Sequence, residues 1–259
     1  MGQTLVIAEK PSVAGDIARA LGGFKKDGDF WVSDAMIVGS AVGHLLEIKA
    51  PEEYDVKRGR WSFANLPVLP PHFDLQPIKK SIKKFEGLEK KIRSRSVTDI
   101  INACDAGREG ELIFRYIIQA TGTKKPIRRL WLQSMTKASI QKAFTALRSD
   151  AEMKPLEAAA RSRSEADWLV GINGTRALTA FNSKDGGFFL TTVGRVQTPT
   201  LAIVVAREEE ITHFKPQNYW EVHATFGAQA GDYDSVWVDA DFKKTKGQSA
   251  ELKPERLWP

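Results

Sequence analysis

Two short apolar runs, each ending in a turn rich in carboxylates, dominate the hydrophobic pattern of the chain. The run over residues 3–8 has the length and composition of a buried strand, and so has the run over residues 97–104. A helical pattern through Leu21 follows the first run, and an amphipathic pattern over residues 112–119 follows the second. The pattern therefore predicts two strands of one parallel sheet, each leading into a helix.

The same alternation of strands and helices continues to residue 150. Further strands are expected over residues 34–42 and 128–132, and further helices over residues 79–94 and 136–147. Strands that alternate with helices are typical of α/β domains. We therefore expect an α/β domain over residues 1–150.

The hydrophobic pattern changes after residue 150. Residues 154–179 form a long helical pattern in which arginines alternate with apolar positions, and another helix is expected over residues 201–211. From Tyr219 the pattern acquires the period of a strand. These changes predict a helical domain over residues 151–215 and the beginning of a β-rich domain over residues 216–259.

Carboxylates gather where the two buried strands end. Glu9 follows the first strand beside Lys10, and Asp105, Glu109 and Glu111 follow the second. Because the carboxyl ends of parallel strands share one edge of a sheet, we expect Glu9 and Asp105 to meet there. Their oxygens suit Mg²⁺, which keeps several waters and is shared with phosphate. The alternative is an acidic surface loop, with Glu favoured at a helix N-terminus.

Composition narrows the class of protein. The 259 residues include 38 Lys and Arg against 32 Asp and Glu, and the net charge of +6 suits a polyanionic partner. One cysteine, Cys104, and four histidines argue against a disulfide scaffold and a structural zinc site. The sequence shows no signal peptide and no apolar run long enough to span a membrane, so a cytoplasmic setting without membrane attachment is expected.

Six sequence blocks stand out along the chain: AEKPS (8–12), GHLLE (43–47), DAGREGE (105–111), WLQSMT (131–136), ADWLVGINGTRALT (166–179) and TVGRVQTPTLAIV (192–204). Together and in this order they resemble the type IA DNA topoisomerases, in particular their bacterial topoisomerase III branch. The resemblance implies a toprim domain, Rossmann-like with a mostly parallel sheet, over residues 1–150. A helical DNA-groove domain and the start of a β-rich arch domain would follow.

The resemblance also implies a chemistry, in which a tyrosine cleaves and rejoins one DNA strand by transesterification and so relaxes or decatenates DNA. It assigns Glu9, Lys10 and Arg108 to catalysis. It assigns Glu9, Asp105 and Glu109 to Mg²⁺. The expected partner is a single-stranded segment of supercoiled or catenated DNA, bound by a monomer at the nucleoid or on a plasmid.

One position departs from the pattern of many relatives, which have Asp-x-Asp-x-Glu where this chain has Gly107 in place of the second Asp. Gly107 has no side chain, so one metal ligand is missing. We therefore expect one Mg²⁺ between Glu9 and Asp105 rather than two metal ions.

The DNA groove implied by the resemblance draws on three parts of the chain. Its expected contacts are Trp61, Trp168, Arg176, Thr192, Val193, Gly194, Arg195, Val196 and Gln197. Hydroxyl residues, a glycine and an arginine just before a helix are suited to backbone phosphates, and an aromatic ring beside arginines stacks on an unpaired base. The alternatives are that Trp61 packs in the core and that Arg163 and Asp167 form an i,i+4 ion pair on a solvated helix.

The tyrosine that the chemistry requires is not evident in this sequence. The family's nucleophile lies in a Tyr-Pro-Arg-Thr-like block, which matches none of Tyr54, Tyr116, Tyr219 and Tyr233. We therefore expect an N-terminal portion of such an enzyme that is inactive by itself. The alternatives are a toprim-type primase or nuclease and a non-catalytic single-stranded DNA-binding module. The blocks ADWLVGINGTRALT and GRVQTPT favour the topoisomerase, because they resemble that family only.

Overall fold

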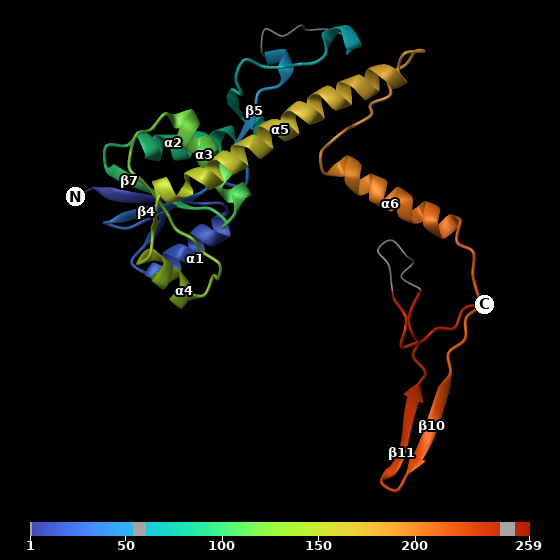
Figure 1. Cartoon of the computed structure of the whole chain (residues 1–259). Helices are drawn as coiled ribbons and strands as arrows, with labels where there is room; N and C mark the ends of the chain where they lie inside the picture. The colour runs from blue at the N-terminus through green and yellow to red at the C-terminus, as the bar shows by residue number, and fades with distance from the viewer. Residues whose placement is uncertain (1, 54–60, 244–251) are drawn as a thin grey trace. The chain divides into compact units, whose positions relative to one another are not determined.

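A seven-stranded sheet in the order β2-β3-β4-β1-β7-β8-β9 carries the first of two packing units, residues 1–198 (Figure 1). The structure is a computed structural model and describes residues 2–53, 61–243 and 252–259. The strands are β1 (Gln3–Ala8), β2 (Lys25–Asp27), β3 (Phe30–Val32), β4 (Met36–Ser40), β7 (Val97–Ala103), β8 (Ile127–Arg129) and β9 (Arg148–Ser149). β1 lies parallel to both β4 and β7, and β7 lies parallel to β8, so the predicted α/β sheet with a parallel centre is confirmed.

Helices cover both faces of this sheet. α1 (Pro11–Leu21) and α4 (Lys137–Phe144) lie on one face, and α2 (Ile82–Arg93) and α3 (Arg108–Thr121) lie on the other (Figure 1). Alternate residues of β1 divide between the two cores. Leu5 and Ile7 pack with α2 and α3, whereas Val6 and Ala8 pack with α1 and α4. Burial on both faces explains why β1 reads as a continuous apolar run.

A long helix, α5 (Asp150–Asn182), starts at the edge of the sheet and extends well beyond it (Figure 1). Its start is fixed by a capping box, in which Ser149 Oγ accepts from the Glu152 N–H and the Glu152 carboxylate accepts from the Ser149 N–H. Its N-terminal part packs on α3. A small antiparallel pair, β5 (Leu46–Ile48) and β6 (Leu75–Pro77), and short 3-10 helices at Pro51–Glu53, Phe63–Asn65 and Lys79–Ser81 complete the described elements of this unit.

The second unit, residues 199–259, holds most of α6 (Gln197–Thr212) and a β-hairpin. The hairpin pairs β10 (His223–Ala228) with β11 (Gly231–Val236) in antiparallel fashion. The strand pattern expected from Tyr219 therefore starts four residues later, at His223. In the part of the chain that the structure describes, no helix is long and apolar enough to cross a membrane.

Two predicted boundaries differ from the structure. The helix expected from residue 112 begins at Arg108, because Gly107 is extended and its carbonyl already accepts the Glu111 N–H. Glu109 and Glu111 therefore belong to the first turn of α3 rather than to a loop. The two packing units divide after Thr198, because α5 packs with the sheet domain. The sequence analysis expected domain boundaries at residues 150 and 215. Those domain limits remain a prediction.

Candidate active site and nucleic-acid groove

Glu9 and Asp105 lie together at the carboxyl ends of β1 and β7. The chain passes from β1 toward β4 and from β7 toward β8, in opposite directions along the sheet. Open α/β sheets bind ligands at such a reversal of strand order. The Asp105 backbone N–H lies 3.4 Å from Glu9 Oε2 and donates to it. The sheet thus brings together two carboxylates that are 96 residues apart in sequence.

Lys10 lies between these two carboxylates. Its Nζ is 3.1 Å from Asp105 Oδ2 and 3.6 Å from Glu9 Oε1. The hydrogen bond that Lys10 Nζ donates to Asp105, followed by the negative charges of Asp105 and Glu9, raises the pKa of Lys10. The ammonium is therefore protonated at neutral pH, and because Lys10 is exposed it can turn toward a phosphate that approaches this edge.

Arg129 supports the turn that carries Asp105, a role that the sequence analysis missed. Its side chain is 1% exposed, and burial lowers its pKa. Its guanidinium donates to four backbone carbonyls around the end of β7: those of Asn102 (3.1 Å), Cys104 (2.7 Å), Asp105 (2.7 Å) and Leu130 (2.9 Å). The sequence held a signal for this role, because Arg129 lies in the strand expected over residues 128–132. An arginine that is buried in a strand is almost always paired with hydrogen-bond acceptors.

Glu111 belongs to this support and does not face the site. It is 0% exposed, its Oε1 accepts from Arg115 Nε at 2.7 Å, and its Oε2 lies 3.3 Å from Arg129 Nε. Asn102 Nδ2 also donates to Glu111 Oε2 at 3.0 Å. Glu111 is therefore buried beneath the acidic site, in contrast to the exposed Asp105. Arg115 lies one helical turn from Glu111 on α3, at i,i+4 spacing, whereas Arg129 comes from β8, so the sequence spacing did not reveal its contact.

The glycines of DAGREGE differ in what surrounds them. A Cβ at Gly110 would lie 2.2 Å from the Asp105 carbonyl oxygen and 2.7 Å from its nitrogen, so α3 can approach Asp105 this closely only with glycine there. A Cβ at Gly107 would meet nothing within 4 Å. Gly107 is also extended, with φ of 167°, which any residue adopts. The motif therefore requires Gly110 sterically, but not Gly107.

Glu109 points toward a different neighbour. Its Oε1 lies 2.5 Å from His44 Nε2, and the pair lines a cavity of about 160 Å³ together with Arg108 and Arg163. Within the described residues, no group of three or more His, Cys, Asp or Glu side chains is arranged to hold a metal ion. The structure thus joins Glu9 to Asp105 and does not add Glu109 as a third member of that set.

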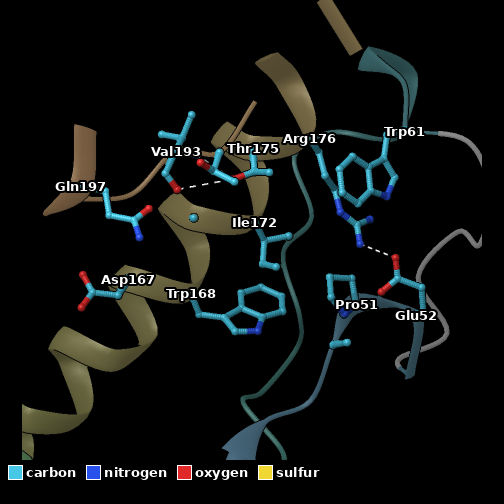
Figure 2. Close-up of a pocket in the computed structure, with 13 residues that line it drawn as sticks. Pro51, Glu52, Trp61, Asp167, Trp168, Ile172, Thr175, Arg176, Val193 and Gln197 are labelled. Carbon is cyan, nitrogen blue, oxygen red and sulfur yellow. Dashed lines mark hydrogen bonds and ion pairs between the residues drawn. The ribbon is translucent and has the colours of Figure 1, made fainter. Parts of the chain in front are cut away.

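The predicted DNA contacts converge on one pocket of about 460 Å³ (Figure 2). Six of the nine line it: Trp61, Trp168, Arg176, Thr192, Val193 and Gln197. They come from the segment after β5, from the middle of α5 and from the stretch before α6. Figure 2 shows Pro51 and Glu52 closing the side opposite α5. Residues far apart in the sequence thus form a single site within the first unit.

Arginine and aromatic groups hold Trp61 at one end of this pocket. The Arg176 guanidinium centre is 5.3 Å from the centre of the Trp61 ring and pairs with Glu52 (Figure 2). The Phe188 ring lies 5.7 Å from Trp61 on a tilted plane. Arg176 is 8% exposed, so it orients Trp61 more than it offers a free charge. Trp168 is fixed by a 3.2 Å hydrogen bond from its Nε1 to the Lys49 carbonyl.

The remaining three predicted contacts form the turn before α6. Arg195 Nη1 pairs with Asp167 Oδ1 at 2.8 Å. The Gly194 N–H donates to Thr198 Oγ1 at 3.1 Å, and Val196 is 57% exposed. Arg163 also lies 3.7 Å from Asp167, so the i,i+4 ion pair expected on α5 is present but shares its carboxylate with Arg195.

Asn173 anchors the proline-rich segment over the pocket, and sequence reasoning gave no indication of it. Its Oδ1 accepts from the Val68 N–H at 2.5 Å and its Nδ2 donates to the Val68 carbonyl at 3.0 Å. One side chain thus completes both backbone hydrogen bonds of a residue 105 positions away. A single asparagine in a helix carries no pattern that predicts such a contact.

Among the described residues of the first unit, neither Tyr116 nor Cys104 offers an exposed nucleophile. Tyr116 is 5% exposed, its hydroxyl bonds Ser164 at 2.9 Å, and burial raises its pKa. Burial likewise raises the pKa of the Cys104 thiol. Tyr219 and Tyr233 belong to the second unit, and Tyr54 lies outside the described residues.

Comparisons with known proteins cover nearly the whole chain. A model of the Toprim domain matches residues 4–135, and a DNA topoisomerase model matches residues 151–255. DNA topoisomerase 3 of Bacillus cereus strain ATCC 14579 is 44% identical over 258 residues, 99% of this chain and 34% of that protein. DNA topoisomerase 3 of Staphylococcus aureus strain USA300 is 44% identical over 223 residues, 86% of this chain and 31% of that protein.

A solved structure agrees at the level of the fold. Full-length topoisomerase I from Thermotoga maritima superposes with a TM-score of 0.57 at 22% identity, covering 95% of this chain and 36% of that one. The chain spans about a third of the length of the curated relatives it matches.

Proposed function

The chain belongs to the topoisomerase III-like branch of the type IA DNA topoisomerases, and we propose that it supplies the acidic half of a site at which one DNA strand is cleaved and rejoined by tyrosine transesterification. One observation carries the proposal. Glu9, Lys10 and Asp105 meet at a reversal of strand order in the same packing unit as a pocket lined by six predicted DNA contacts. In a complete enzyme this chemistry relaxes or decatenates DNA.

Glu9 and Asp105 fit a Mg²⁺ ion. Mg²⁺ prefers oxygen ligands and needs only one or two carboxylates beside waters and phosphate oxygens. The Asp105 side chain is 52% exposed, so waters and a phosphate have access to it, whereas the Glu9 side chain beside it is 11% exposed. When bound there, Mg²⁺ neutralises phosphate charge and stabilises the charge that develops on the leaving oxygen. The role of Glu109 as a third ligand remains a prediction, because its carboxylate contacts His44 in this structure.

Lys10 and Glu9 have separate roles in strand cleavage. Lys10, protonated and exposed, stabilises the negative charge that builds up on the attacked phosphate. Glu9 holds and delivers a proton to the 3′ oxygen as that oxygen leaves. Arg108 lies at the start of α3 beside His44 and Glu109, where its planar guanidinium suits bidentate pairing with a carboxylate or phosphate.

The groove binds a single-stranded segment of DNA. An unpaired base can enter the pocket between Trp61 and Trp168, whereas a base within a duplex has no free face to stack. Arg195, in the turn before α6, binds the phosphates that follow. A monomer in the cytoplasm, next to nucleoid or plasmid DNA, is the setting that accords with this function.

The first test separates this proposal from a toprim-type nuclease. The chain is incubated with end-labelled single-stranded DNA and Mg²⁺, treated with protease and run on a denaturing gel. We expect neither free-ended fragments nor a peptide-linked product, because the carboxylates and Lys10 move protons and hold phosphate without a nucleophile. Free ends would show hydrolysis by a nuclease, and a peptide-linked product would identify one of the four tyrosines as the nucleophile.

A further inference from the structure

A row of hydroxyl groups on α5 and its C-cap residue holds the segment that leads to the predicted DNA-contacting turn. Three side chains four residues apart accept hydrogen bonds from three backbone N–H groups two residues apart. The pairs are Thr175 with Val193 (3.0 Å), Thr179 with Thr191 (3.0 Å) and Ser183 with Phe189 (2.9 Å). Asn182 Nδ2 adds a bond to Thr191 Oγ1 at 2.6 Å. The segment therefore runs back along the helix in the opposite direction.

The dimensions of helix and extended chain explain why the row continues over three pairs. Four residues of α-helix rise about 6 Å, and two residues of extended chain advance about 6.6 Å. Every fourth helical side chain thus meets every second amide. Thr179 and Ser183 are only 1% and 7% exposed, so an amide deprived of its hydroxyl there stays unsatisfied.

A glycine on the same face of α5 allows the close approach. A Cβ at Gly174 would lie 2.8 Å from Val193 Cγ1 and 3.0 Å from Val193 Cβ. The helix thus presents a bare backbone where Val193 packs, next to the hydroxyl of Thr175 that binds the Val193 N–H. The glycine and the hydroxyl together define one position of the segment along the helix.

We infer that Thr175, Thr179 and Ser183 are positioning residues that fix the register of residues 189–193 on α5. This register places Val193 and the neighbouring Thr192 on the pocket and brings Arg195 to Asp167. A segment that slipped by two residues would carry different side chains to the pocket. The inference rests on the proposed single-stranded DNA groove and names the residues that set its shape without contacting the DNA phosphates.

The test replaces one hydroxyl in the full 259-residue chain. Thr179→Val keeps the shape of the side chain and removes the acceptor, so we expect single-stranded DNA to bind about three- to tenfold more weakly. The slope of affinity against salt should stay unchanged, because no phosphate contact is removed. Thr179→Ser, which keeps a hydroxyl, should restore the affinity. Ser162→Ala, an exposed serine on α5, is the matched control and should bind as the original chain does.

Amide hydrogen exchange measures the register directly. The Thr191 N–H should exchange slowly in the original chain and in Thr179→Ser, and fast in Thr179→Val. Ser183→Ala, at the end of the helix, provides the same test at the Phe189 N–H in case Thr179→Val does not fold. Unchanged exchange, or unchanged DNA affinity in both variants, would overturn the inference. If the original chain binds no single-stranded DNA, the proposed groove fails, whereas the exchange pattern still decides whether the hydroxyls hold the segment.

Discussion

Gly110 shows how a residue without chemistry shapes the acidic site. The Asp105 carbonyl fills the space that a side chain at residue 110 would need, and the first turn of α3 therefore touches the turn that carries Asp105. The positions of Glu9, Lys10 and Asp105 at the sheet edge could be predicted from the sequence, because each residue directly follows an apolar run that forms a buried strand. The burial of Glu111 between Arg115 and Arg129 could not, because it depends on which side chains the folded sheet brings beneath the site.

The first residue-scale prediction is that Gly110→Ala destabilises the chain by about 1–3 kcal/mol, since the new methyl group must displace the Asp105 backbone. Denaturant unfolding followed by circular dichroism measures the change. Gly107→Ala is the matched control, because its Cβ enters open space on an extended backbone, and its unfolding midpoint should stay close to that of the original chain. Equal midpoints for both variants would contradict the close packing at Gly110.

The second residue-scale prediction concerns Mg²⁺ affinity. Titration calorimetry should show weaker binding for Glu9→Gln, because one of the two adjacent carboxylates loses its charge. Gly107→Asp should bind more tightly, because it adds a carboxylate two residues from Asp105 where nothing lies within 4 Å. Glu89→Gln, on α2, serves as a control for general charge loss. Identical affinities for the original chain and Glu9→Gln would remove Glu9 from the metal site.

At the scale of elements, α5 links the two sites. Its N-terminal part reaches Arg115 of α3 through Asp150 and Glu157, and its middle lines the proposed DNA pocket. The long helical pattern made this helix predictable. Its start at Asp150, ahead of the expected Lys154, follows from the capping box of Ser149 and Glu152, which the apolar periodicity does not reveal. The extension of Phe189–Val193 along α5 was also missed, because isolated threonines do not predict a docked segment.

The element-scale prediction is that the capping box stabilises the chain in a pH-dependent way. Hydrogen bonds from the Ser149 side chain and N–H lower the pKa of Glu152, and Arg115 lowers that of Asp150 against the opposing effect of burial. A lowered folded-state pKa means that the stabilisation is present above the unfolded-state pKa and is lost as the pH falls through the folded-state pKa.

Thermal unfolding of Ser149→Ala tests this element. The variant should melt a few degrees below the original chain at pH 7, and the difference should shrink at an acidic pH below the lowered folded-state pKa of Glu152, where its carboxylate is protonated. Ser162→Ala, exposed in the middle of α5, should melt with the original chain at both pH values. A difference that stays constant between the two pH values would show that the Glu152 charge has no part in the cap.

For the whole molecule, the order of elements was largely predictable and the assembly of the groove was not. The α/β class follows from buried strands that alternate with amphipathic helices. The groove joins residues 50–52, Trp61, residues 167–176 and residues 192–197, and tertiary contacts such as Asn173 with Val68 bring them together. The resemblance to a family supplied the residues of this groove in advance as predicted DNA contacts. It did not show that Arg176 is buried against Glu52, so that its charge serves Trp61 rather than a phosphate.

The affinity of the chain for single-stranded and duplex DNA, measured by fluorescence anisotropy over a range of salt concentrations, tests the central claim most directly. We predict tighter binding of the single strand and a steep loss of affinity with salt.

Arg195→Ala should weaken binding and reduce the salt slope by about 0.7, the value of one phosphate contact on a single strand. Arg176→Ala should weaken binding with little change in slope, because Arg176 is buried and paired with Glu52. Arg93→Ala, an exposed arginine paired with Glu89 at the opposite end of β7 from Asp105, should change neither value. Equal affinity for both forms of DNA, or an Arg195→Ala variant that binds with the original affinity and slope, would contradict the single-stranded groove.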